Sequence, residues 1–379
     1  MDFKLTEEQL MIRSSIREFC EKYIEPIAEE IDREGRYPLD NMKKLGEKGF
    51  LGVPYGKEYG GAGADLLSYM IVIEEVSRAC ASTGISIECH TSLASFPIFA
   101  YGTEEQKQKF LRPLCTGEKL AGFALTEPTA GTDVGGALTT AVLDGDDYVI
   151  NGSKIFISNA YYSGILTVFA LTDPSKGNKG ISAFAVPSDT PGITISEPMD
   201  KLGIRASAQS EVIFKDVRVP KANLLGKEGE GFKIAMHTLD GGRIGIAAQA
   251  LGIAQAALDE SIRYAKERKQ FGKPIASFQA IQWMIAEMAK DVAAARLLTY
   301  HAAWCYDQGL PYSEEAAMAK LFASEAAAHH TNKAIQVFGG IGFIKGSKVE
   351  RLYRDSKITE IYEGTSEVMK MVIAGKELK

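Results

Sequence analysis

The chain has 379 residues, of which 45% are hydrophobic and 24% charged, and its formal net charge at pH 7 is -6. This composition is typical of a globular protein with a large core. The acidic balance, without a dense run of Lys and Arg, argues against nucleic-acid binding. No apolar run is long enough to cross a bilayer, and residues 1–8 do not resemble a signal peptide. We therefore expect a cytoplasmic protein that binds no membrane.

The cysteines and histidines give no sign of a metal site or a disulfide framework. The five cysteines are odd in number and form no C-x-x-C pair, which favours buried thiols. His329 and His330 are adjacent within a helical run, and adjacent side chains on a helix point in different directions. We expect no metal site.

Residues 1–118 are predicted to form an N-terminal α-helical domain. Apolar residues recur at helical spacing over residues 7–19. Further helices are expected near residues 40–49, 66–81 and 103–112.

Residues 119–228 are predicted to form a middle β domain. Strand-like runs lie at 166–170, 181–186 and 211–214. Residues 148–158 read as a hairpin with Asn151 and Gly152 at its tip, and residues 144–147 read as a turn rather than a calcium loop. Short strands without intervening helices predict a compact antiparallel sheet.

Residues 229–379 are predicted to form a C-terminal α-helical bundle domain. Long periodic runs cover 232–267, 277–308 and 313–337, and the last ends at a Gly-Gly pair that can cap it. Helices of this length predict a bundle, and their apolar content suggests packing against another subunit.

The segment Ile361–Glu367 carries a chemical signal of its own. Glu363 follows an apolar Ile-Tyr pair, and desolvation by apolar neighbours makes a carboxylate a stronger base. Gly364 lets a ligand approach the backbone closely. Thr365 and Ser366 can cap the helix that follows, whose free N–H groups suit a carbonyl or an anion. Alone, the segment also fits an ordinary capped surface helix behind a solvated glutamate.

A second signal is the loop at residues 123–133, where the chain enters the β domain. Its sequence, Phe-Ala-Leu-Thr-Glu-Pro-Thr-Ala-Gly-Thr-Asp, predicts a tight turn with exposed N–H and O–H groups. Such groups can bind a flavin edge or a pyrophosphate. A simple connecting turn explains the same residues equally well.

Six segments occur in register along the chain: 123–133, 154–159, 239–243, 267–272, 336–340 and 361–365. Together they resemble the acyl-CoA dehydrogenase family over essentially the whole chain, and most closely its short-chain, butyryl-CoA branch. The resemblance implies an α+β fold with an N-terminal helical domain, a middle antiparallel β domain and a C-terminal four-helix bundle. It implies FAD as cofactor and interconversion of a butyryl-type acyl-CoA and its trans-2-enoyl-CoA. Electrons would be exchanged with an electron-transferring flavoprotein, and the protein would be a homotetramer, a dimer of dimers.

The resemblance also implies a role for each matching residue. Glu363 would be the catalytic base. The FAD contacts within the chain would be Phe123, Leu125, Thr126, Gly131, Thr132, Phe156 and Ser158, with Thr365 and Glu367 at the adenosine diphosphate portion. The contacts to the FAD of a neighbouring subunit would be Arg268, Phe271, Gln279, Gln336, Gly339 and Gly340. The acyl-CoA contacts would be Thr132, Asp240, Arg243, Tyr362 and Gly364.

Two features distinguish this chain within the family pattern. Gly242 stands where some members carry their base, so the base assignment falls to Glu363. Ala160 and Tyr161, followed by Tyr162, replace the two glycines usual in the butyryl-type pattern, and could narrow the site, alter partner docking or cover the surface. The alternatives are an enoyl-CoA reductase component of an electron-bifurcating complex, an oxidase-like relative that passes electrons to oxygen, and a non-catalytic helical scaffold.

Overall fold

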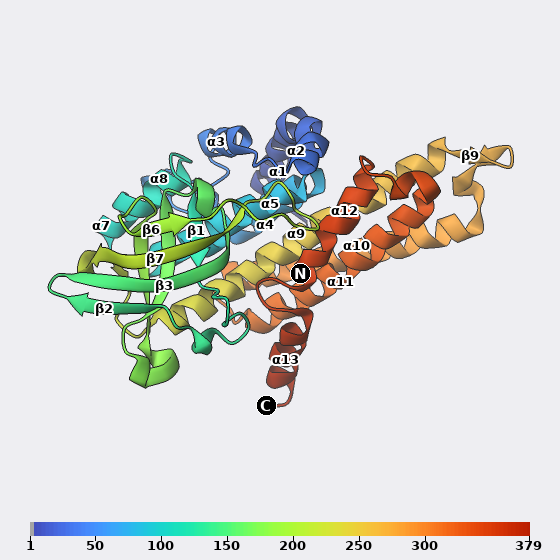
Figure 1. Cartoon of the computed structure of the whole chain (residues 1–379). Coiled ribbons are helices and arrows are strands. Elements are labelled where there is room, and N and C mark those ends of the chain that lie inside the picture. Colours follow the sequence, from blue (N-terminus) through green and yellow to red (C-terminus); the bar gives the residue numbers. More distant parts are fainter. Residues whose placement is uncertain (1–3) are drawn as a thin grey trace.

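The computed structural model describes residues 4–379, with helices at both ends of the chain and a sheet in the middle (Figure 1). This arrangement confirms the predicted α+β fold. Within residues 4–379, every helix is too short or too polar to cross a membrane. The five cysteines are buried and unpaired, as expected.

The first helical region packs around one nearly buried helix, α4. Its helices are α1 (Glu7–Phe19), α2 (Ala28–Glu34), α3 (Leu39–Glu47), α4 (Leu66–Ala79), α5 (Ala81–Glu88), α6 (Phe96–Tyr101), α7 (Glu104–Gln106) and α8 (Arg112–Cys115). α1 begins at a reciprocal capping box between Thr6 and Gln9. α4 begins where the Asp65 carboxylate accepts the Ser68 N–H at 2.7 Å. Because α4 contacts α1, α9 and α10, it joins the two helical regions.

The central sheet is mixed rather than purely antiparallel. Its strands are β1 (Ala121–Ala124), β2 (Thr140–Asp144), β3 (Asp147–Ser158), β4 (Ile165–Leu171), β5 (Ile181–Pro187), β6 (Ile193–Ile195), β7 (Gln209–Pro220) and β8 (Leu224–Leu225). They lie in the order β6-β7-β3-β2-β4-β5-β8, with β1 beside β4. β4 runs parallel to β1 and to β2, and the other pairs are antiparallel. Only strands joined by a tight turn must be antiparallel, and no such turn joins β4 to β1 or to β2.

The predicted hairpin tip at Asn151 and Gly152 is wrong. β3 runs unbroken through both residues, and the turn lies one strand earlier, between Asp144 and Asp147. Gly152 instead lies at a bulge, where the register with β7 shifts and φ is 147°. A β-carbon there would approach Thr139 Oγ1 to 2.5 Å, so the glycine is needed for close packing rather than for a turn.

Alternate residues of β4 face two different cores. Ile165 and Phe169 pack with the helices, whereas Leu166, Val168 and Ala170 pack with other sheet residues. This two-residue period is that of an extended strand, and burial on both faces explains why the strand reads as a continuous apolar run.

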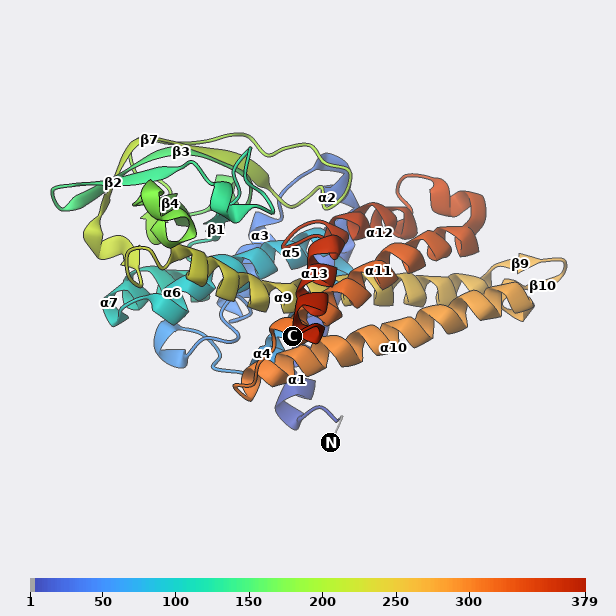
Figure 2. The same cartoon turned by 90° about the horizontal axis from the view of Figure 1, so that it is seen from below.

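The C-terminal region is built on three long helices, α9, α10 and α11, that lie side by side (Figure 2). Its elements are α9 (Gly231–Glu267), β9 (Lys269–Gln270), β10 (Lys273–Pro274), α10 (Gln279–Asp307), α11 (Ser313–Phe338), α12 (Lys348–Ser356) and α13 (Ser366–Glu377). α12 packs against α9 and α11. The β9–β10 hairpin lies at the end of the bundle away from the sheet. At 1.5 Å per residue, the 37 residues of α9 span roughly 55 Å between these two ends.

Candidate active site

A cleft of about 720 Å³ opens between the sheet and the C-terminal helices. Its walls come from the ends of β1 and β3, the loop 199–204, α9, and the loop that precedes α13. It brings together these predicted site residues: Phe123, Leu125, Thr126, Gly131, Thr132, Phe156, Ser158, Arg243, Tyr362, Glu363, Gly364 and Thr365. The loop at 123–133 and the segment 361–367, far apart in sequence, therefore form one site.

Glu363 lies in a strained turn directly before α13. Its φ is 54°, a left-handed conformation that is unfavourable for a residue with a β-carbon, and Gly364 follows with φ 103°. Thr365 caps α13, as predicted, by accepting the Val368 N–H at 3.3 Å. The strained turn and the cap together fix where the Glu363 carboxylate lies.

The Glu363 carboxylate is buried without a conventional hydrogen-bond partner. In the described part of the chain, no donor contacts either of its oxygens. A β-carbon at position 242 would lie 2.2 Å from Glu363 Oε2 and 2.7 Å from Leu93 Cδ2, so Gly242 leaves the space that the carboxylate fills. Burial raises the pKa of Glu363 to about 7, against the opposing influence of Glu88, Lys320 and Arg243.

Lys320 on α11 fastens the turn that carries Glu363. Its side chain is fully buried, and its Nζ donates to the Gly364 carbonyl oxygen at 2.5 Å. Burial lowers the pKa of Lys320 to about 8, while the charge of Glu363 acts to raise it. No sequence pattern indicates a role for Lys320, because a lysine in an Ala-rich helix ordinarily lies on a solvated face.

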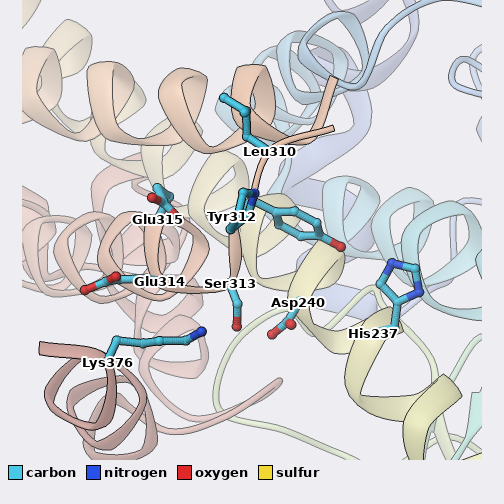
Figure 3. Close-up of a pocket in the computed structure, with 9 residues that line it drawn as sticks. His237, Asp240, Leu310, Tyr312, Ser313, Glu314, Glu315 and Lys376 are labelled. Atoms are coloured by element: carbon cyan, nitrogen blue, oxygen red, sulfur yellow. The ribbon is translucent and has the colours of Figure 1, made fainter. Parts of the chain in front are cut away.

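Asp240 and Arg243 were both expected to contact the acyl-CoA, but they line different hollows. Arg243 lines the main cleft and donates to Asp240 at 2.6 Å. Asp240 lines a second hollow of about 250 Å³, together with His237, Tyr312 and Lys376 (Figure 3). Asp240 therefore orients the guanidinium of Arg243 rather than lining the cleft itself.

A buried ion pair holds the loop at residues 123–133. Lys154 on β3 donates to Leu125 O at 3.0 Å and to Glu127 Oε1 at 2.7 Å. The same carboxylate accepts the N–H groups of Leu138 at 2.6 Å and Thr139 at 3.0 Å. Because every one of these bonds is within or beside the loop, the exposed hydroxyl and N–H groups of the loop are held in place.

The cleft walls fit a flavin. Phe156 is 61% exposed with φ 60°, at an irregularity in β3 that turns its ring outwards. The hydroxyl of Ser158 accepts from Gln209 Nε2 at 3.1 Å. Apolar side chains with a few hydroxyl and N–H groups between them are the surface that a planar ring with polar edges requires.

Several predicted contacts lie outside the cleft. Six of them lie at the β9–β10 hairpin, at the start of α10 and at the end of α11: Arg268, Phe271, Gln279, Gln336, Gly339 and Gly340. Glu367 is an exposed residue of α13. Phe271 is 92% exposed. The cleft also contains residues that the sequence analysis missed: Cys89, Leu93, Met199, Leu202, Met236, Leu239 and Val368. These are apolar residues of ordinary helices and loops, so only the fold identifies them.

The residues that stand in place of the usual glycine pair lie beside the cleft rather than in it. Tyr162 stacks on Tyr37 with ring centroids 4.4 Å apart. Tyr161 is 41% exposed and donates to Glu197 at 2.9 Å. Neither tyrosine is among the residues that line the cleft, so neither narrows it.

This fold and this cleft define a flavin-dependent oxidoreductase, and comparison identifies its family. The chain matches the N-terminal, middle and C-terminal domains of acyl-CoA dehydrogenase over residues 6–118, 122–217 and 229–378. The protein belongs to the acyl-CoA dehydrogenase family, whose members use FAD.

Its relatives include short-chain enzymes. It is 55% identical to the short-chain specific acyl-CoA dehydrogenase of Clostridium acetobutylicum, over 99% of each chain. Butyryl-CoA dehydrogenase of Megasphaera elsdenii has the same fold, with 47% identity, a TM-score of 0.98 and full coverage of both chains. A chain of a third solved structure is 51% identical, with a TM-score of 0.99 and full coverage of both chains. That structure concerns the electron transferring flavoprotein of Acidaminococcus fermentans and flavin-based electron bifurcation.

Proposed function

We propose that this protein interconverts a short, butyryl-type acyl-CoA and its trans-2-enoyl-CoA, with Glu363 as the base. The observation that carries the proposal is the buried, unpartnered Glu363 carboxylate in the cleft, whose pKa of about 7 suits proton transfer near neutral pH. The family and the short-chain relatives support the substrate class.

The proposed mechanism uses the strained turn in two ways. Glu363 removes the proton from Cα of the acyl group, which needs its carboxylate form. The N–H of Gly364 donates to the thioester oxygen and stabilises the charge that develops there. FAD, when bound, accepts a hydride from Cβ. Arg243, oriented by Asp240, supplies positive charge beside the same turn.

The preference for a short acyl group is supported by what lies behind the base. Tyr362 donates a hydrogen bond to Gln249 on α9, so the turn before α13 is tied directly to the bundle. Leu93 also lines the cleft next to the Glu363 carboxylate. We propose that Tyr362 and Leu93 close this end of the cleft and so favour a short acyl group.

We infer that the residues around the β9–β10 hairpin complete the FAD site of a neighbouring subunit, as in a homotetramer that is a dimer of dimers. The inference is supported by the exposure of Phe271, which is 92% exposed in the β9–β10 hairpin, since large exposed apolar side chains can mark contact surfaces. Arg268→Ala should lower FAD content without unfolding the chain. An electron-transferring flavoprotein is the proposed electron partner.

The proposed reaction is tested by an anaerobic visible spectrum of the FAD-loaded protein before and after addition of butyryl-CoA. Bleaching of the flavin spectrum is expected in the wild type. Glu363→Gln should bind FAD and show no bleaching. Wild-type bleaching by the variant would exclude Glu363 as the base, and failure of the wild type to bleach would exclude butyryl-CoA as the substrate.

A further inference from the structure

A second buried carboxyl group faces the base. Glu88, the last residue of α5, has no solvent exposure, and no donor from the described residues contacts either of its oxygens. Carboxylate oxygens of Glu88 and Glu363, together with Cys89 Sγ, lie within 4.8 Å of one another. A β-carbon at Gly245 would come within 2.5 Å of Glu88 Oε1. α9 thus presents one glycine to each carboxyl group, Gly242 to Glu363 and Gly245 to Glu88.

Two carboxylates in this position cannot both be ionised at little cost. Each would lack a hydrogen bond in a desolvated site, and the like charges would repel. One shared proton removes both penalties, because a carboxylic acid donates to a carboxylate in a short, charge-assisted hydrogen bond. Among the described residues, neither carboxyl group accepts a hydrogen bond of ordinary geometry, although the Ser92 hydroxyl and the Cys89 thiol lie near enough to Glu88 to lower its pKa against the effect of burial.

We propose that Glu88 is a positioning residue for the base: as a neutral carboxylic acid, it donates a hydrogen bond to the Glu363 carboxylate. This proposal rests on the proposed function of Glu363. Burial, and next the charge of Glu363, raise the pKa of Glu88 well above its usual range, which agrees with Glu88 holding the proton. The other titratable or charged groups that face the pair are Tyr55, Tyr69 on α4, Cys89, Arg243 on α9, Lys320 on α11 and Tyr362.

The hydrogen bond has two consequences for the reaction. It stabilises the charged form of Glu363, so the base is ionised at lower pH than burial alone would allow. It also fixes the orientation of the carboxylate. Before the reaction the pair holds one proton and a single negative charge. After Glu363 takes the α-proton of the substrate, the pair holds two protons and is neutral, and it returns one proton to solvent before the next turnover.

Two substitutions in the FAD-loaded enzyme test the proposal. Glu88→Leu removes the donor, whereas Glu88→Gln keeps an N–H that can donate to Glu363 but cannot share a proton. The rate of flavin reduction by butyryl-CoA is measured as a function of pH. Glu88→Leu should move the acidic limb of the profile to higher pH by about one pH unit or more and regain activity in alkaline buffer. Glu88→Gln should remain closer to the wild type.

Infrared spectroscopy of the resting enzyme provides a readout besides activity. At a pH where Glu363 is ionised, the wild type should show a protonated carboxyl band that Glu88→Gln lacks and Glu363→Gln retains. A loss of activity in Glu88→Leu by the same factor at every pH, or an unchanged profile, would overturn the proposal. If Glu88→Leu does not fold, presence of the band in Glu88→Gln would do the same. Full activity of Glu363→Gln would instead refute the base assignment.

Discussion

Gly242→Ala tests the position of the base without touching the base itself. The new methyl carbon would lie 2.2 Å from Glu363 Oε2, whereas ordinary contact begins at 3.4 Å. The carboxylate must therefore move by roughly 1 Å, and a misplacement of that size can reduce a rate about 100-fold. Crowding costs about 1–3 kcal/mol, but alanine gains about 1 kcal/mol over glycine within a helix, so the variant should lose no more than about 2 kcal/mol of stability and stay folded.

The matched control is Gly241→Ala on the same turn of α9, where no atom beyond the adjacent helix backbone and the two neighbouring residues lies within 4 Å of the added carbon. It should be slightly more stable than the wild type and equally active. The assay is stopped-flow reduction of the bound flavin by butyryl-CoA, with thermal unfolding measured in parallel. A Gly242→Ala variant that reduces its flavin at the wild-type rate would show that the Glu363 carboxylate does not act from the position described.

Three further changes have outcomes that follow from buried charges. Folding raises the pKa of Glu363 from 4.5 to about 7. Between these pH values the native state binds more protons than the unfolded state, so the stability of the wild type falls as pH rises. In denaturant titrations, Glu363→Gln should therefore be more stable than the wild type at pH 8, by at most about 3 kcal/mol, and differ little from it at pH 4. Lys320→Met removes the hydrogen bond to Gly364 and should lower kcat more than tenfold. Lys320→Arg should not restore kcat, because the larger guanidinium does not fit the buried site. Lys154→Met leaves Glu127 buried without its cation and should cost about 3 kcal/mol in urea unfolding; an unchanged midpoint would show that the pair is dispensable.

Local patterns were sufficient to predict most elements of this fold. The long helices follow from apolar periodicity, and the cap at Thr365 follows from residue type. The prediction of a hairpin tip at Asn151 and Gly152 was wrong because a single sequence does not distinguish a glycine at a bulge from a glycine in a turn. Only the packing against Thr139 distinguishes them.

The site was predicted where its chemistry lies in contiguous segments and missed where it depends on tertiary contacts. Glu363 and Gly364 are adjacent in sequence, so one segment indicates both. Lys320 and Glu88 come from helices that are far from this segment in sequence. Charged residues on helices are usually solvated, and only the folded chain shows that these two are buried beside the base.

The burial of α4 has a consequence for how the chain is made. Eleven of its 14 residues are buried. Its most extensive contacts are with α9, and it also packs against α10; the ribosome releases both of these helices only after the whole sheet has emerged. The part of the α4 surface that faces α9 and α10 therefore stays uncovered through the middle of translation, which is when such surfaces aggregate. Chaperone demand should peak at that stage, and a fragment that stops before residue 231 should be insoluble although it contains all of the first two regions.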